Sequence, residues 1–243
     1  MFTLIKKEIN SFFSTLSGYI AIIVFLLANS MFLWVFPGEF NILDNGYATI
    51  DSLFIIAPWI FLFLIPAITM RLFSEEKRAG TIELLLTRPV SDFNIVLSKY
   101  LSGVVIVLFS LVPALIYFLS VYLLGSPVGN IDTGGTWGSF IGLFFLAAVY
   151  VAIGVFSSSL TENQIISFII ALILSFIFYI GFESISTMGG FNKIEGLIVN
   201  LGINEHYKSI RRGVIDTRDL LYFCSVITLF IFFTKYIIQS RKW

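Results

Sequence analysis

Residues 70–90 read MRLFSEEKRAGTIELLLTRPV and lie between two apolar runs that are each long enough to cross a bilayer. Acidic, basic and apolar side chains follow one another closely in this segment, and its leucine triplet has no obvious cover in the neighbouring sequence. Such a segment is typical of an ordered element that is held by a partner. The runs on either side predict that the element joins two membrane spans.

The composition indicates an integral membrane protein. Hydrophobic residues make up 58% of the chain and charged residues only 12%, whereas soluble domains contain about 25% charged residues. The formal net charge is zero, so no overall basic field indicates nucleic acid as a partner. We therefore expect an all-α membrane protein whose main surrounding is the lipid bilayer.

The chain has one cysteine and one histidine, which limits its chemistry. Cys224 lies in an apolar run and excludes an intrachain disulfide or a cysteine-based metal cluster; it is expected to be a small core residue. His206 excludes a His-x-x-x-His zinc site and is expected to be solvated. No Ser–His nucleophile pattern stands out. The sequence therefore predicts no catalytic residue, no metal site and no enzyme activity in this chain.

Six apolar runs approach the length of about 20 residues that a helix needs to cross the hydrocarbon. They cover residues 19–36, 53–70, 100–124, 140–156, 165–182 and 220–238. The chain is thus predicted to be a single transmembrane domain, 1–243, with six membrane-spanning helices. The first run ends without a small-residue cleavage pattern, so we expect it to remain as a span and not to be removed as a signal peptide.

The first 18 residues predict an amphipathic helix at the membrane surface. Ile5, Ile9 and Phe12 recur at helical spacing, while Lys6 and Lys7 lie on the opposite face. A cationic face combined with an aromatic apolar face suits anionic headgroups. The alternative reading of the same residues is a plain helical extension of the first span.

Lysine and arginine predict the orientation, because loops rich in these residues stay in the cytoplasm. In a six-span topology segments 37–52 and 125–139 contain neither residue. The basic residues on the other side are Lys6, Lys7, Arg71, Lys77, Arg78, Arg88, Lys99, Arg241 and Lys242. Both termini are therefore predicted to be cytoplasmic. Segment 183–219 disagrees, since it would lie outside and yet carries Lys193, Lys208, Arg211, Arg212 and Arg218.

The charged segment 71–99 is predicted to consist of short helices. Ser74 is a favourable N-cap and Gly80 a favourable stop, with acidic residues early and basic residues late, as the helix dipole prefers. Thr81 is predicted to start a second helix, which ends before Pro89. Ser91 or Asp92 is predicted to start a third helix, which continues into the next span. An ordered element of this kind can dock into a soluble protein or lie on the lipid surface, and the residues alone favour neither.

A resemblance to ABC-2 type transporter permeases rests on this segment. The motif is Glu75–Glu76–Lys77–Arg78–x–Gly80–Thr81–x–Glu83–Leu84–Leu85–Leu86–x–x–Pro89–Val90, followed by Lys99. Six spans, an N-terminal surface helix and a long last external segment are similar to that family as well, so the resemblance covers the chain end to end. Within the family, residues 207–223 and the ending 240–243 resemble gliding-motility-associated permeases and the permeases of copper-site maturation transporters.

The resemblance implies a division of labour in the inner membrane of a bacterial cell. A separate cytoplasmic ABC ATPase subunit would hydrolyse ATP, and a coupling helix in segment 71–99 would transmit its movement to the spans. This chain has no Gly-x-x-x-x-Gly-Lys-[Ser/Thr] motif, so no cofactor is expected on it and ATP is used by the partner. Further implied partners are a second permease copy or a paralogue and an accessory membrane protein. The residues implied for ATPase coupling are Glu75, Glu76, Lys77, Gly80, Thr81, Glu83, Leu84, Leu85, Leu86 and Pro89.

The last external segment, 183–219, is predicted to be ordered. Asn204 can cap a helix that ends at Arg211–Arg212–Gly213, and Asp216 with Asp219 resembles a capping pair that opens the final span. This segment could be a lid or docking surface, although a packed cap over the bundle is favoured because such helices mostly bury an apolar face.

Two other functions stay open on the residues alone, an ion-coupled secondary transporter and a non-transporting membrane scaffold. Ion-coupled carriers place ionisable side chains inside spans, whereas Lys235 is the main example here and lies near a helix end, where it can reach the interface. Polar side chains in the spans could line a substrate path but more often join helices. They are Asn29, Ser30, Ser110, Tyr117, Ser175 and Tyr179.

Three prolines are predicted to act as hinges. Pro58 and Pro66 should bend the second span, and Pro113 should bend the third. These are the spans that flank the proposed coupling helix. We expect the bends to be the places where displacement of that helix changes the shape of the bundle.

Overall fold

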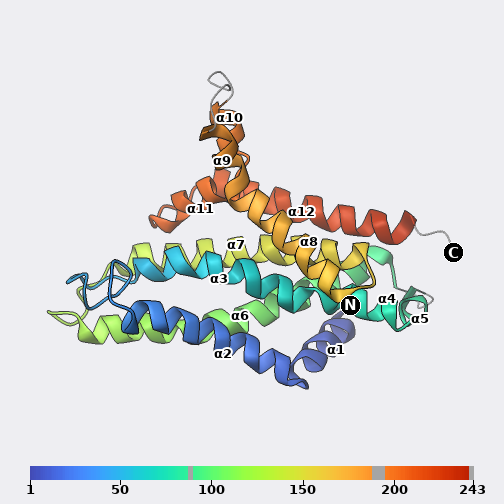
Figure 1. Ribbon diagram of the computed structural model, residues 1–243, viewed down its shortest axis with the longest axis horizontal. Helices are drawn as coiled ribbons and strands as arrows, with labels where there is room; N and C mark the ends of the chain where they lie inside the picture. Colours follow the sequence, from blue (N-terminus) through green and yellow to red (C-terminus); the bar gives the residue numbers. More distant parts are fainter. Residues whose placement is uncertain (87–89, 188–194, 241–243) are drawn as a thin grey trace.

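The computed structural model describes residues 1–86, 90–187 and 195–240, and every regular element in these ranges is helical. Figure 1 shows long helices that run side by side, with several short helices at one end and others that stand out from the side. The elements are α1 (Phe2–Phe13), α2 (Leu16–Ser30), the π-helix η1 (Met31–Val35), α3 (Asp51–Thr69), α4 (Arg71–Arg78), α5 (Ile82–Leu86), α6 (Asp92–Leu124), α7 (Thr133–Leu160), α8 (Gln164–Phe176), the π-helix η2 (Ile177–Gly181), α9 (Phe182–Thr187), α10 (Glu195–Val199), α11 (Ile203–Arg211) and α12 (Thr217–Ser240).

Six helical stretches in the described ranges are long and apolar enough to cross a membrane, which confirms the predicted fold class. They are Gly18–Val35, Asp51–Arg78, Asp92–Leu124, Thr133–Leu160, Gln164–Ser186 and Thr217–Ser240. The N-terminus, the end of α12 and the short helices α4 and α5 lie at one end of this bundle (Figure 1). We call this the α4 end, and the opposite end, where α2 leads to α3 and α6 to α7, the α7-start end.

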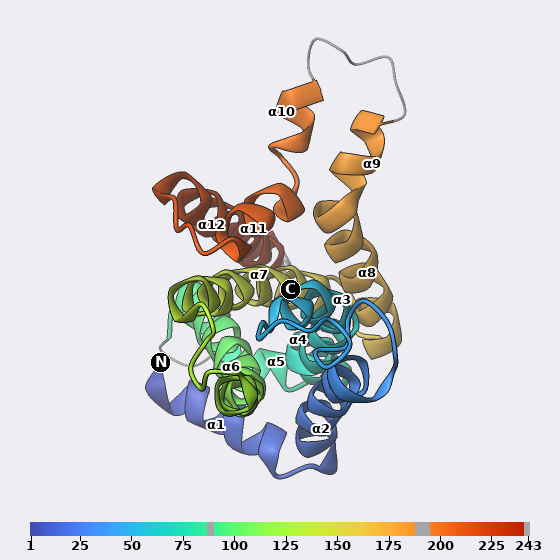
Figure 2. The ribbon, with the colours of Figure 1, turned by 90° about the vertical axis from the view of Figure 1, so that its left-hand side faces the viewer.

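Helix α7 occupies the centre of the bundle and contacts α3, α6, α8, α11 and α12. Figure 2 shows this arrangement from the α7-start end. Glycines allow its neighbours to approach closely. A Cβ atom on Gly154 would overlap Thr69 Oγ1 of α3 and lie 2.8 Å from Thr69 Cβ, and one on Gly142 would lie 2.8 Å from a methyl group of Ile210. Small residues at such crossings are typical of helix packing inside membranes.

Helix α1 is a separate helix, so it is no extension of the first span. The backbone is extended at Thr15 (φ −106°, ψ 149°), between α1 and α2. Its apolar face is partly covered by the protein itself, because α1 packs against α6 and its Phe12 is buried. Ile5 and Ile9 are half-buried and Phe2 is exposed, so the role of α1 at the lipid surface stays a prediction.

The second span and α4 form almost one helix. Met70, the residue between α3 and α4, keeps right-handed helical angles (φ −53°, ψ −30°). The described part of segment 71–99 holds α4, α5 and the first turns of α6, in agreement with the predicted short helices. Both predicted bends in the second span lie inside α3, which runs through Pro58 and Pro66 without interruption, and α6 likewise continues through Pro113.

Segment 183–219 is ordered over its described part, and α11 is a packed cap. Tyr207 is buried and donates to the Phe54 carbonyl at 2.7 Å. The predicted cap at Asn204 is wrong, since α11 begins at Ile203 and the Asn204 amide donates to Glu183 at 2.7 Å. The predicted stop at the arginine pair is confirmed by the end of α11 at Arg211.

The start of the last span is capped by Asp216, whose carboxylate accepts the Arg218 backbone N–H at 2.9 Å. Asp219 does not share in this cap but pairs with His206 at 2.7 Å. The His206 ring also stacks on Tyr222. His206 is therefore not simply solvated. The expectation for Cys224 was wrong as well, since this cysteine is exposed on α12. Helices α9 and α10 extend away from the bundle (Figure 2).

Candidate functional site

The α4–α5 hairpin at the α4 end is the centre of the candidate site. Helix α4 begins at Arg71, so Ser74 is not its N-cap; the Ser74 hydroxyl donates to the Met70 carbonyl within the helix. Helix α5 begins at Ile82, one residue after Thr81, as predicted. Helix α6 follows with Ser91 as its N-cap, which accepts the Asn94 N–H at 3.4 Å.

Gly80 ends α4 in the manner that the sequence predicts. It has a left-handed backbone (φ +67°), which glycine adopts without steric cost. The Gly80 N–H donates to the Lys77 carbonyl at 3.1 Å, and the Thr81 N–H donates to the Glu76 carbonyl at 3.0 Å. This pair of hydrogen bonds is a Schellman motif, which satisfies the last carbonyls of a helix. The Thr81 hydroxyl also donates to Glu76 O at 3.3 Å.

The inner face of α4 is tied to the end of α7. Ser158 Oγ accepts the backbone N–H groups of Phe73 at 2.8 Å and of Ser74 at 3.1 Å, and it donates to the Met70 carbonyl at 3.0 Å. Lys77 is buried and donates to the Ser159 carbonyl. These contacts fix α4 against α7. Lys77 therefore lies inside the chain and not on a surface that a partner could reach.

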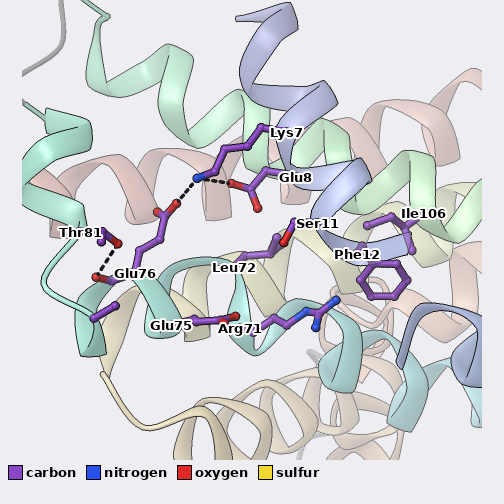
Figure 3. A pocket seen from close by; sticks show the side chains of 11 residues that line it. Lys7, Glu8, Ser11, Phe12, Arg71, Leu72, Glu75, Glu76, Thr81 and Ile106 are labelled. Carbon is purple, nitrogen blue, oxygen red and sulfur yellow. Dashed lines mark hydrogen bonds and ion pairs between the residues drawn. The ribbon is translucent and has the colours of Figure 1, made fainter. Parts of the chain in front are cut away.

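Four charged side chains join α4 to α1 and α6, and we call them the ionic cluster: Lys7, Glu8, Glu76 and Lys99. Lys99 of α6 is only 2% exposed and lies 2.8 Å from Glu76 and 3.1 Å from Glu8. Lys7 of α1 lies 3.0 Å from the other oxygen of Glu76. Figure 3 shows Lys7 and Glu8 reaching from α1 toward Glu76 on α4. Glu76 is thus an internal link between three helices.

The ionic cluster also raises the pKa of Lys7, its most exposed member. Burial alone would lower the pKa of Lys7, but the hydrogen bond and charge of Glu76, together with Glu8, outweigh it and raise the pKa above the usual 10.5. Lys7 therefore stays protonated throughout the physiological range. Beside the cluster is a pocket of about 240 Å³, in which Arg71 lies over the Phe12 ring at 4.7 Å (Figure 3).

The outer face of the hairpin is exposed. Leu84 is 68% exposed, although its side chain is apolar. The exposed residues of this face are Glu75, Arg78, Ala79, Gly80, Thr81, Glu83 and Leu84, and we call them the docking face. Pro89 and the side chains of Leu85 and Leu86 lie outside the described residues.

Of the residues that the sequence assigns to coupling, the structure brings Glu75, Gly80, Thr81, Glu83 and Leu84 together on the docking face and places Glu76 and Lys77 behind it. Sequence reasoning missed Glu8, Ser158 and Ser159, which hold α4 in place. A single acidic residue in a basic helix and a serine run at the end of a span are the signals that could have found them.

Polar side chains within the spans mainly join helices where they have partners. Ser30 of α2 and Tyr117 of α6 share a hydrogen bond of 2.8 Å, and Tyr117 also donates to Leu26 O at 2.7 Å. Asn29 donates to the Phe25 carbonyl of its own helix at 2.7 Å. Ser110 and Ser175 are buried hydroxyls without a hydrogen-bond partner in the described residues, and Tyr179 packs edge-on against Trp59 and Tyr150. The hydrogen bonds of Ser30 and Tyr117 therefore join α2 to α6.

Comparison with known families agrees with this architecture. Residues 5–237 match the family described as ABC-2 family transporter protein. No curated protein matches the chain. In the described part of the chain, no group of three or more His, Cys, Asp and Glu side chains could hold a metal ion. Because the family match covers nearly the whole chain, and the six spans agree with it, this protein belongs to the ABC-2 family of membrane transporter proteins.

Proposed function

We propose that this chain is the permease subunit of an ATP-binding cassette transporter. A separate cytoplasmic ATPase subunit hydrolyses ATP, and the chain couples that reaction to movement of a substrate across the membrane or to transmembrane signalling. The observation that carries the proposal is the docking face. It presents both signs of charge and an exposed leucine, at the end of the bundle where α1 begins and α12 ends.

The contacts behind the docking face support coupling, because they connect it to several helices. Glu76 and Lys99 join α4 to α6, and Ser158 joins α4 to α7. A force on the docking face is therefore passed to the spans instead of bending a free loop. Glu76 and Lys77 act as positioning residues in this scheme, and Pro58, Pro66 and Pro113 are the hinges that absorb the movement.

The same scheme predicts the orientation of the protein in its membrane and its partner proteins. The α4 end faces the cytoplasm of a bacterial cell, so both termini are cytoplasmic and the spans cross the inner membrane. The permease pairs with a second copy or a paralogue. The similarity of residues 207–223 to gliding-motility-associated permeases supports membership of such a system, which also includes an accessory membrane protein. Adjacent reading frames for an ATPase and a large accessory membrane protein would support this placement; their absence would count against it.

An ion-coupled carrier receives less support. The charged side chains of the described spans lie near helix ends, as Lys99 and Lys235 do, and not in the middle of the membrane. A coupling ion would need a charged or strongly polar site at depth. A scaffold without transport would account for the docking face but not for the contacts that tie it to α6 and α7.

Co-purification with the ATPase subunit tests the proposal. Leu84→Asp places a charge at the apolar centre of the docking face and should abolish co-purification, since such centres usually dominate the affinity. The matched control is Leu43→Asp, because Leu43 is 65% exposed and lies in the segment between η1 and α3, at the α7-start end. Glu83→Lys should weaken binding more than Glu83→Ala if the partner surface is basic. Equal ATPase yields from Leu84→Asp and Leu43→Asp would show that the hairpin does not bind the ATPase.

A further inference from the structure

A charged pocket of about 490 Å³ lies at the α7-start end, far from the docking face. Its walls come from the residues that precede α3, from the first turns of α3 and α7, and from the last turn of α11. The polar residues that matter are Asp51, Asp132, Arg211 and Arg212. The function proposed above makes no use of them.

The two arginines have no ionic partner within the described residues. Arg211 is half-buried and Arg212 is exposed, and neither forms an ion pair there, whereas Lys208 of the same helix pairs with Glu183 at 2.8 Å. The planar guanidinium group binds phosphate through two parallel hydrogen bonds. Two adjacent unpaired arginines in a concave site are therefore suited to a phosphate group.

The carboxylates of the pocket restrict the ligand further. Asp132 caps α7, where its carboxylate accepts the Gly135 N–H at 2.9 Å. Asp51 is exposed in the first turn of α3. The two aspartates balance the two arginines, so a simple anion would meet repulsion as well as attraction. A headgroup with a phosphate and a primary ammonium complements both pairs.

An apolar groove of about 700 Å³ adjoins the charged pocket, and Ile55 of α3 lines both. Every residue that lines the groove is apolar, and they come from α2, η1, the segment after η1, α3 and α8. Ile55, Trp59, Phe63 and Ala67 form one stripe of α3 along it. At 1.5 Å per residue this stripe is roughly 18 Å long, close to one leaflet of a hydrocarbon core that is about 30 Å thick.

We propose that the pocket and the groove together bind one phospholipid with a zwitterionic headgroup. Its phosphate lies between Arg211 and Arg212, its ammonium group meets Asp51 beside Asp132, and an acyl chain follows the groove along Trp59 and Phe63. The site shares no residue with the docking face and lies at the opposite end of the bundle. Loss of lipid binding and loss of ATPase binding are therefore distinguishable.

Native mass spectrometry of the purified permease tests the headgroup. The probes are phosphatidylethanolamine, phosphatidylglycerol and phosphatidylcholine with identical chains, and phosphatidylethanolamine should bind most tightly because only it offers both phosphate and a hydrogen-bonding ammonium. Arg212→Gln should lower its affinity on the order of tenfold, as expected for a lost charged hydrogen bond. Asp51→Asn should weaken phosphatidylethanolamine but not phosphatidylglycerol.

Arg218→Gln is the matched control, because Arg218 is exposed and does not line the pocket. It should leave all three affinities unchanged. Arg212 is itself exposed, so its replacement should leave the thermal unfolding midpoint unchanged and remain interpretable. If Arg212→Gln and the double variant Arg211→Gln/Arg212→Gln bind lipid like Arg218→Gln, the headgroup site does not exist.

A second variant tests whether the groove holds the chain. Ala67→Trp should fill the end of the groove that is remote from the charged pocket, and so weaken lipids with long chains while dihexanoyl phosphatidylethanolamine binds as before. Equal loss for both chain lengths, or none for either, overturns the assignment of the groove. A disulfide between two copies in membranes, formed by Phe63→Cys in a Cys224→Ser background, would also overturn this assignment. The groove would then be a subunit interface.

Discussion

Replacing Glu76 with glutamine should destabilise the permease itself, although the sequence motif places this residue among those that contact the ATPase. The structure makes Glu76 the link between Lys7 and Lys99, with its side chain only 13% exposed. Glutamine keeps the shape and one acceptor oxygen but removes the charge. Helix α4 should then separate more easily from α1 and α6.

The size of the effect follows from the two partners. Removing one partner of a buried ion pair costs about 3–5 kcal/mol when the other charge is left without a partner, and Lys99 is 2% exposed and lies 2.8 Å from Glu76. Lys7 is 57% exposed, so its pair adds at most about 1 kcal/mol. Lys99 keeps Glu8 at 3.1 Å after the change. We therefore expect a loss of about 2 kcal/mol, or roughly 4–8 °C in the unfolding midpoint by the scaling for chains of this length.

Thermal unfolding of the purified permease in detergent measures this loss, and Glu83→Gln is the control. Glu83 carries the same charge in the same hairpin but is exposed on the docking face, so its replacement should change stability by less than about 0.5 kcal/mol. Glu83→Gln should instead reduce stimulation of the ATPase. Equal midpoints for the two variants would refute the division between inner and outer faces.

A double-mutant cycle makes the test specific to the pair. Lys99→Met leaves Glu8 and Glu76 facing each other without their buried cation, and adding Glu76→Gln should relieve part of that cost. The two losses should therefore fall short of additivity by more than about 0.5 kcal/mol. Additive losses would show that Glu76 and Lys99 do not act on each other.

The ionic cluster also predicts a pH dependence through Lys7. Its folded pKa is raised above the usual 10.5, so its contribution is fully present below that pH and is lost as the pH rises through the folded value. The destabilisation caused by Lys7→Met should thus be constant from neutral pH to about pH 9 and should shrink only above pH 10.5. A midpoint difference that already falls between pH 7 and 9 would contradict this.

Three further predictions concern packing, hinges and topology. Gly154→Ala should cost about 1–3 kcal/mol in unfolding experiments because its methyl group would overlap Thr69, whereas Gly196→Ala, with no atom near its added methyl, should be neutral. Pro66→Ala should leave ATPase binding intact and change the stimulation of ATP hydrolysis; unchanged stimulation would remove the hinge. In a Cys224→Ser background, a cysteine at Tyr47, which is 77% exposed, should react with an impermeant thiol reagent from outside. A cysteine at Ala79 should not.

Length and hydropathy were sufficient to predict the six spans, because a helix must satisfy its own backbone in lipid. Local capping rules also identified Gly80 as the stop of α4 and Ser91 as a start. They failed at Ser74, since a serine inside a helix can bond back to the preceding turn as well as cap a new helix. Nothing local distinguishes the two cases.

The candidate site was only half predictable for a related reason. Glu75, Glu76 and Lys77 are consecutive charged residues, and the sequence gives no reason to separate them. Their separation depends on which face of α4 meets Lys99 and Ser159, and these residues lie in other helices. Glu76 and Lys99 are 23 positions apart in the sequence, and Lys77 and Ser159 are 82 positions apart. Contacts between residues so far apart leave no pattern in the neighbouring sequence.

The nearly continuous helix of α3 and α4 has a mechanical consequence. Its 28 residues at about 1.5 Å each make a rod of roughly 42 Å, with the docking hairpin at one tip and Asp51 at the other. A tilt imposed at Arg78 would then swing Asp51 in the opposite direction about the crossing with α7, as in a lever with a fixed pivot. If the rod stays straight, the distance between probes on Arg78 and Asp51 should stay constant while each probe moves relative to α12. Bending at the prolines would shorten that distance.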